Sequence, residues 1–100
     1  MNNSKIRVTK EKIDNLKESI ITILPNSKIY LFGSRVDRNQ KGGDIDILII
    51  GNRQLDFREK AKIERNFFEK FGEQKLDLIS FEYNNKSSFK EIALEKAIKL

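Results

Sequence analysis

The segment GDIDILII, residues 43–50, decides the fold of this chain. Its last six residues are apolar apart from Asp46, and a run that is apolar on both faces is typical of a strand inside a sheet. Gly51 and Asn52 end the run. We therefore predict a central strand at residues 45–50, flanked by other strands and covered by helices.

Two further strands are expected on either side of this one along the chain. KIYLF at residues 28–32 and KLDLISF at residues 75–81 are rich in β-branched and aromatic residues, which favour strands. A last short strand is expected at residues 97–100. Polar connectors follow the first strand at residues 35–43 and the third at residues 84–88.

Helical spacing of apolar residues predicts three helices. Thr9 can cap the first helix, which ends before residues 25–27, and the third covers residues 89–96. The second covers residues 55–71, and Gly72 is expected to end it in the αL conformation. Its apolar side is expected to consist of Phe57, Ala61, Phe67, Phe68 and Phe71.

These elements predict one α+β domain over residues 1–100, a two-layer sandwich with helices packed on a mixed sheet of three to four strands. No apolar run is long enough to span a membrane, and residues 1–10 lack the apolar region of a signal peptide. A chain without cysteine fits a reducing compartment, so we expect a cytoplasmic protein.

The composition also limits the chemistry. The chain has no cysteine and no histidine, which excludes disulfides, thiolate zinc sites and histidine bases. Any metal must be held by oxygen, which favours Mg²⁺, Mn²⁺ or Ca²⁺. The net charge of +5 attracts polyanions, but on charge alone a solvated lysine-rich surface is the preferred explanation, so nucleic acid is not an expected partner.

Two acids stand at the start of the central strand. Asp44 and Asp46 are two residues apart and therefore lie on one face of a strand, where they repel each other and lose hydration. A divalent cation between them removes that cost. The alternative is that Asp44 caps a turn and Asp46 pairs with a lysine or arginine.

A third acid, Asp77, lies inside the apolar strand at residues 75–81. Its alternative explanation is a salt bridge to a nearby lysine such as Lys75. If the two strands are neighbours, however, Asp77 can meet Asp44 and Asp46 at one point. Three convergent carboxylates commonly hold two Mg²⁺ ions for phosphoryl transfer.

The first strand leads directly into Gly33, Ser34 and Arg35. This strand is expected to run antiparallel to the central strand, so that Gly33 and Ser34 lie beside Asp44. Glycine lets a ligand approach the backbone, and the following N–H groups and the hydroxyl of Ser34 can bind phosphate oxygens. Arg35 adds a fork of donors that suits phosphate. The alternative is a simple tight turn, because neither the P-loop pattern nor the dinucleotide-binding glycine pattern is present.

Taken together, LFGSR at residues 31–35, GDIDILI at 43–49 and LDLI at 76–79 resemble the DNA polymerase β-like nucleotidyltransferase superfamily, and in particular its minimal nucleotidyltransferase (MNT) branch. The resemblance implies that Asp44, Asp46 and Asp77 are catalytic and ligate Mg²⁺, with two ions expected. It implies that Gly33, Ser34 and Arg35 bind the phosphates of a nucleoside triphosphate.

The resemblance further implies transfer of a nucleoside monophosphate, most simply AMP from ATP, to a hydroxyl on a protein partner. Many MNT proteins are antitoxins of HEPN toxins, so a HEPN-type toxin is the expected partner. Asp37 departs from the family pattern, because many relatives carry an arginine there and an acid disfavours phosphate. A non-catalytic antitoxin that neutralises its partner by contact is therefore the alternative, and self-association is left open.

Overall fold

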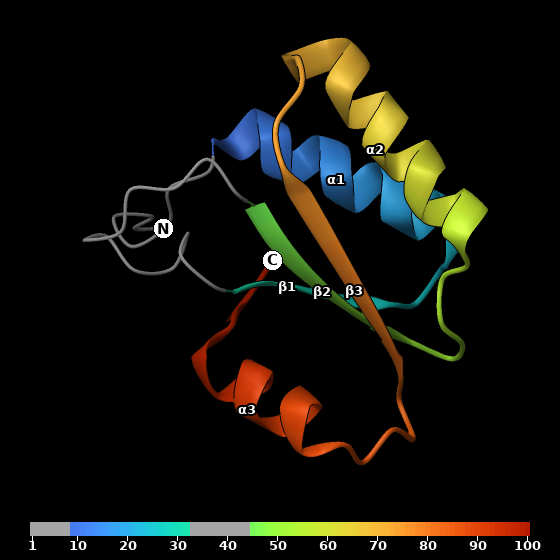
Figure 1. Cartoon of the computed structure of the whole chain (residues 1–100), viewed down its shortest axis with the longest axis vertical. Helices are drawn as coiled ribbons and strands as arrows, with labels where there is room; N and C mark the ends of the chain where they lie inside the picture. Colours follow the sequence, from blue (N-terminus) through green and yellow to red (C-terminus); the bar gives the residue numbers. More distant parts are fainter. Residues whose placement is uncertain (1–8, 33–44) are drawn as a thin grey trace.

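The computed structural model describes residues 9–32 and 45–100, which form three helices and four strands (Figure 1). The elements are α1 (Lys10–Ile23), β1 (Lys28–Phe32), β2 (Ile45–Gly51), α2 (Phe57–Phe71), β3 (Leu76–Glu82), α3 (Ser88–Lys96) and β4 (Ile98–Lys99). This order and the α+β class agree with the prediction from the sequence. None of the helices in these two ranges is long and apolar enough to cross a membrane.

The four strands form one mixed sheet in the order β3-β2-β1-β4. β1 runs antiparallel to β2 and to β4, whereas β3 runs parallel to β2. The predicted antiparallel pairing of the first two strands is confirmed, and so is the central position of β2. The parallel pairing of β2 and β3 follows from the crossover through α2.

Apolar residues on both faces of β2 face different helices. Ile45, Ile47 and Ile49 belong to the main core with residues of α1 and α2. On the other face, Leu48 and Ile50 form a smaller cluster with Ala93 of α3. Figure 1 shows α1 and α2 together on one side of the sheet and α3 on the other. This arrangement explains why the sequence of β2 lacks a polar face.

The beginning of α2 differs from the prediction. The helix starts at Phe57 rather than at residue 55, and Asp56 caps it in a capping box with Glu59. Phe57 is 85% exposed, so its assignment to the apolar side was wrong, and the buried residues of the helix are Ile63 and Phe67. At about 100° per residue, Phe57 lies about 120° around the helix from Ile63 and therefore faces away from the sheet.

Gly72 ends α2 as expected but in a different conformation. Its φ of 83° is positive, as predicted, whereas its ψ of 170° lies outside the αL region. The N–H of Gly72 still donates to the carbonyl of Phe68 at 2.8 Å. A residue with this φ is unstrained only as glycine.

Lys90 is a buried cation that joins β3 to α3. Only 9% of the residue is exposed, and its Nζ donates to the backbone carbonyls of Glu82, Tyr83 and Asn85 at 3.3, 2.9 and 3.0 Å. An ammonium has three donors, and here each has an acceptor. Lys90 therefore holds the turn after β3 to the first turn of α3.

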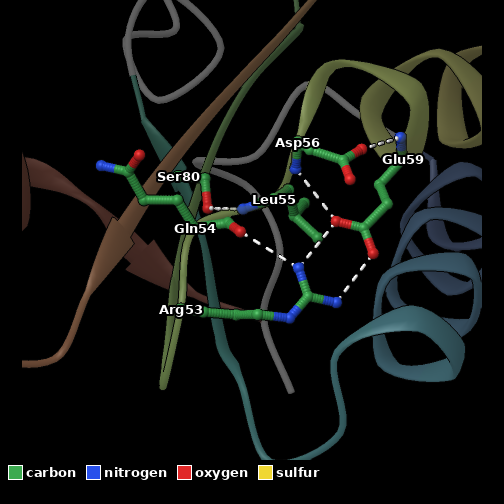
Figure 2. Close-up of polar contacts among 6 residues, drawn as sticks. All are labelled: Arg53, Gln54, Leu55, Asp56, Glu59 and Ser80. Atoms are coloured by element: carbon green, nitrogen blue, oxygen red, sulfur yellow. Dashed lines mark hydrogen bonds and ion pairs between the residues drawn. The ribbon is translucent and has the colours of Figure 1, made fainter.

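The connector between β2 and α2 is held by the polar network of Figure 2. Arg53 donates two hydrogen bonds to the carboxylate of Glu59, at 2.8 and 2.7 Å. The same carboxylate accepts the backbone N–H of Asp56 at 2.9 Å. Ser80 of β3 accepts the backbone N–H of Leu55 at 2.9 Å, which fastens the connector to the sheet.

This network predicts an acid-sensitive contribution to stability. The hydrogen bonds from Arg53, followed by the backbone of Asp56, lower the pKa of Glu59 from 4.5 to about 2. A carboxylate with a depressed pKa stabilises the fold above its ordinary pKa, and that stabilisation is lost as the pH falls from 4.5 towards 2. We expect Glu59→Gln to destabilise the protein at pH 7 and to flatten this part of the pH profile of the urea midpoint. A profile as steep as that of the wild type would contradict the assignment.

Candidate functional site

Two of the predicted acids are direct neighbours in the sheet. The parallel register of β2 and β3 pairs Asp46 with Asp77, and the antiparallel register of β1 and β2 pairs Phe32 with Asp46. Neighbouring strands lie about 4.8 Å apart, so the two backbones hold the carboxylates within reach of one ion. The proximity that the sequence could only propose for Asp46 and Asp77 is present in the structure.

Both acids lie on the face of the sheet that α3 partly covers. Along β2, Asp46 precedes Leu48 by two residues, and along β3, Asp77 precedes Ile79 by two, so each shares a face with that apolar residue. Leu48 and Ile79 belong to the cluster beneath α3, whereas both acids are half-buried. In Figure 1 both strands start at the upper end of the sheet and α3 lies at the lower end. The two acids therefore lie just beyond the apolar cluster that α3 covers.

The salt bridge considered as the alternative for Asp77 is absent from the described part of the chain. Within residues 9–32 and 45–100, its carboxylate forms no ion pair with Lys75 or with another cation. A half-buried carboxylate in an apolar strand loses part of its hydration. The position therefore favours a role that requires the charge.

The other predicted site residues lie outside the described part of the chain. They are Gly33, Ser34, Arg35 and Asp44, and Asp37 lies there too. The expectation that Ser34 lies beside Asp44 therefore stays a prediction. The last described residue before this gap, Phe32, is paired with Asp46, so the chain enters the segment beside the acid pair.

The donor set suits a hard divalent cation. Asp46 and Asp77 offer carboxylate oxygens, which Mg²⁺ prefers, and the chain has no cysteine or histidine to draw a softer metal. No group of three or more candidate ligands occurs among the residues that the structure describes. Two of the three predicted ligands thus lie in the described part, and the predicted third, Asp44, immediately precedes β2 in the sequence.

Two polar features that hold the elements of the domain together were not predicted from the sequence. The capping box of α2 could have been found, because an Asp followed three residues later by Glu is its usual signature. The burial of Lys90 left no such signal, since a lysine within a short helix is normally exposed.

A family model and solved structures place the chain among known proteins. Residues 16–100 match the family model described as "Polymerase beta, Nucleotidyltransferase". A search of the curated proteins found no match.

Solved structures of toxin–antitoxin complexes are similar to this chain in fold. One is a mutant toxin–antitoxin MntA–HpeT complex, with 21% identity, a TM-score of 0.61, and 93% of this chain and 71% of that chain covered. A second mutant of that complex has 18% identity and a TM-score of 0.64, with 92% and 71% covered. A third is a tri-AMPylated HEPN toxin from Shewanella oneidensis in complex with its MNT antitoxin, with 21% identity, a TM-score of 0.54, and 88% and 70% covered.

At these sequence identities the similarity to solved structures shows the fold alone. The family model spans most of the chain and shows the family. The three helices and the mixed four-stranded sheet are those of a nucleotidyltransferase-like α+β fold. The acid pair lies within the matched range. The chain therefore belongs to the polymerase beta nucleotidyltransferase family.

Proposed function

We propose that this protein is a Mg²⁺-dependent nucleotidyltransferase that transfers AMP from ATP to a hydroxyl on a HEPN-type toxin and thereby acts as its antitoxin. The observation that carries the proposal is the pairing of Asp46 with Asp77 on adjacent strands of a family domain. The MNT antitoxin of Shewanella oneidensis, whose fold this chain shares, is found with a tri-AMPylated toxin, which favours AMP as the group transferred.

The reaction is an in-line displacement at the α-phosphorus of ATP. The acceptor hydroxyl oxygen forms a bond to the α-phosphorus, the bond from that phosphorus to the bridging oxygen breaks, and pyrophosphate leaves with the electron pair. The hydroxyl proton passes to the carboxylate of Asp77. Bound Mg²⁺ would supply charge neutralisation at the attacking and leaving oxygens.

The residues of the site bind either the metal or the nucleotide, and Asp77 also accepts the proton of the hydroxyl. Asp46 and Asp77 hold the metal from neighbouring strands, with Asp44 as the third ligand. Gly33, Ser34 and Arg35 bind the phosphates of ATP. They directly follow Phe32 in the sequence, and Phe32 is paired with Asp46.

A second candidate function is neutralisation of the toxin by contact alone. The observation that favours it is Asp37, an acid in the segment assigned to phosphate binding. The two functions differ in whether the acids are needed after the complex has formed.

Co-expression with a candidate HEPN-type toxin, sought first in the adjacent reading frame, separates the two functions. With the wild-type chain, we expect the toxin to gain the mass of AMP and the cells to survive. The Asp44→Asn, Asp46→Asn double variant should fold and still bind the toxin, yet should neither modify it nor protect the cells. Full protection by the double variant with no change in toxin mass would establish contact as the mechanism instead.

The metal is tested separately by thermal unfolding. Because Mg²⁺ binds the folded site, it should raise the melting temperature with concentration, by about 2.7 kcal/mol of stability at 100 times its dissociation constant. Asp46→Asn removes a ligand and should abolish this gain. An unchanged gain in the variant would place the ion elsewhere, and KCl at equal ionic strength controls for salt effects.

A further inference from the structure

A groove runs between α1 and α2 on the surface of the molecule, separate from the acid pair. Its volume is about 720 Å³, and its walls are the two helices themselves. Ser19 and Asn66 join the walls in the middle through a hydrogen bond of 2.6 Å, and Lys12 bonds Gln74 at 3.2 Å. Residue numbers rise from Lys12 to Ser19 as they fall from Gln74, just after α2, to Asn66 within it, so the helices are antiparallel, as Figure 1 also shows.

The two walls carry opposite charge. The charged side chains that line the α1 wall are all acidic, namely Glu11, Asp14 and Glu18. The α2 wall is mainly basic, with Lys62, Arg65 and Lys70 against a single acid, Glu69. These seven residues are all exposed.

The opposite charges do not neutralise each other within the molecule. Asp14 pairs with Lys10 of its own helix, and no other charged residue of the groove forms an ion pair within residues 9–32 and 45–100. The contact across the middle is instead the neutral pair of Ser19 and Asn66. Two parallel stripes of opposite sign are thus left facing the solvent, and each is complementary to the other.

We propose that this groove is the interface of a two-fold dimer of the chain, with the axis parallel to α1 and α2. Such an axis lays the α1 wall of one copy on the α2 wall of the other. The contact between an acidic wall and a basic wall is therefore formed twice, once on each side of the axis. A two-fold axis across the helices would lay α1 on α1 and acid on acid. The charge pattern therefore selects both the occupant, a second copy, and its orientation.

The size of the surface predicts a weak dimer. A helix of 14 residues is about 21 Å long and about 10 Å wide, so two helices offer roughly 400 Å² of flat area. A stable interface buries about 800 Å² on each partner. The dimer should consequently dissociate in the micromolar range or above and should weaken as salt screens the stripes.

Sedimentation equilibrium from about 1 µM to about 1 mM protein tests this dimer. The wild type should dimerise reversibly, and its dissociation constant should rise at least about tenfold from low to high salt. Glu11→Lys with Glu18→Lys makes both walls basic, and Lys62→Glu with Arg65→Glu makes both acidic. Each pair should raise the dissociation constant at least about tenfold through like-charge contact.

Two further samples test the orientation. The chain that combines all four substitutions has its walls exchanged and should dimerise again, and an equimolar mixture of the two paired variants should form a heterodimer. Glu91→Lys with Glu95→Lys, on exposed positions of α3, is the charge-matched control and should leave dimerisation unchanged.

Three results would overturn the proposal. The first is a wild-type protein that is monomeric at every concentration. The second is failure of the variant with all four groove substitutions to dimerise, and the third is a control variant that weakens association as much as the groove variants do. If the wild type is monomeric and the groove variants no longer bind the toxin, the groove is the binding site of the toxin instead. Circular dichroism of every variant checks that the exposed substitutions leave the fold intact.

Discussion

Replacing Asp77 with asparagine is expected to leave nucleotide binding largely intact and to lower AMP transfer at least about 100-fold. Changes in the surroundings of a metal ligand already cost about 10- to 100-fold, so loss of a ligand that also receives the proton should cost more. The amide is nearly the same size as the carboxylate and keeps the pairing with Asp46 in the sheet. The variant should therefore fold, because only the charge has been removed.

The measurement combines single-turnover transfer to the toxin with nucleotide binding by calorimetry. Glu82→Gln is the matched control, because Glu82 ends the same strand, is exposed, and undergoes the same change from acid to amide. The control should transfer at the wild-type rate. Wild-type transfer by the Asp77→Asn protein would remove this residue from the mechanism, whereas loss of transfer in both variants would point to damage to β3.

Replacing Lys90 with methionine is expected to destabilise the fold by about 3 kcal/mol. The change keeps the length and the apolar stem of the side chain but withdraws three donors from the carbonyls of Glu82, Tyr83 and Asn85. Hydrogen bonds from a charged donor contribute about 1.5–3 kcal/mol each, and part of the loss is offset because the turn can reach water. For a domain of this size the melting temperature should fall by about 15 °C.

Lys96→Met on the exposed end of α3 is the control, and its stability should stay within about 0.5 kcal/mol of the wild type. Urea unfolding gives the free energies, and transfer assayed well below the melting temperature should be nearly unchanged in both variants. An equally small effect at Lys90 would mean that its three hydrogen bonds do not hold β3 to α3. This separates a residue that maintains the fold from one that takes part in the chemistry.

The order of the elements could be predicted because each carries a local signal. β2 was expected to be central because both of its faces are apolar, and Leu48 and Ile47 do lie in clusters on opposite sides of the sheet. Thr9 was expected to cap α1, and its side chain accepts the N–H of Lys12 at 3.4 Å. Side-chain periodicity and capping depend on residues only a few positions apart, so they can be read along the chain.

The error at Phe57 has a physical cause that the local pattern hides. An aromatic residue at the start of a helix is readily assigned to the apolar side from its residue type. Its burial, however, depends on which side of the helix faces the sheet. That side is set by Ile63 and Phe67, both fully buried, and Phe57 turns away from them. The outcome therefore depended on how α2 docks onto β2 and β3, which no short stretch of residues specifies.

The amino-acid sequence by itself determined the set of strands and helices, the exclusion of cysteine and histidine chemistry, and the candidate acids Asp44, Asp46 and Asp77. Only the tertiary structure decided that Asp77 lies beside Asp46, that Lys90 is buried, and that α1 and α2 leave oppositely charged walls along one groove. The physical reason is separation along the chain. The register between β2 and β3 is set by the packing of the helix that connects them, and residues 31 positions apart in sequence become neighbours only when that packing is complete.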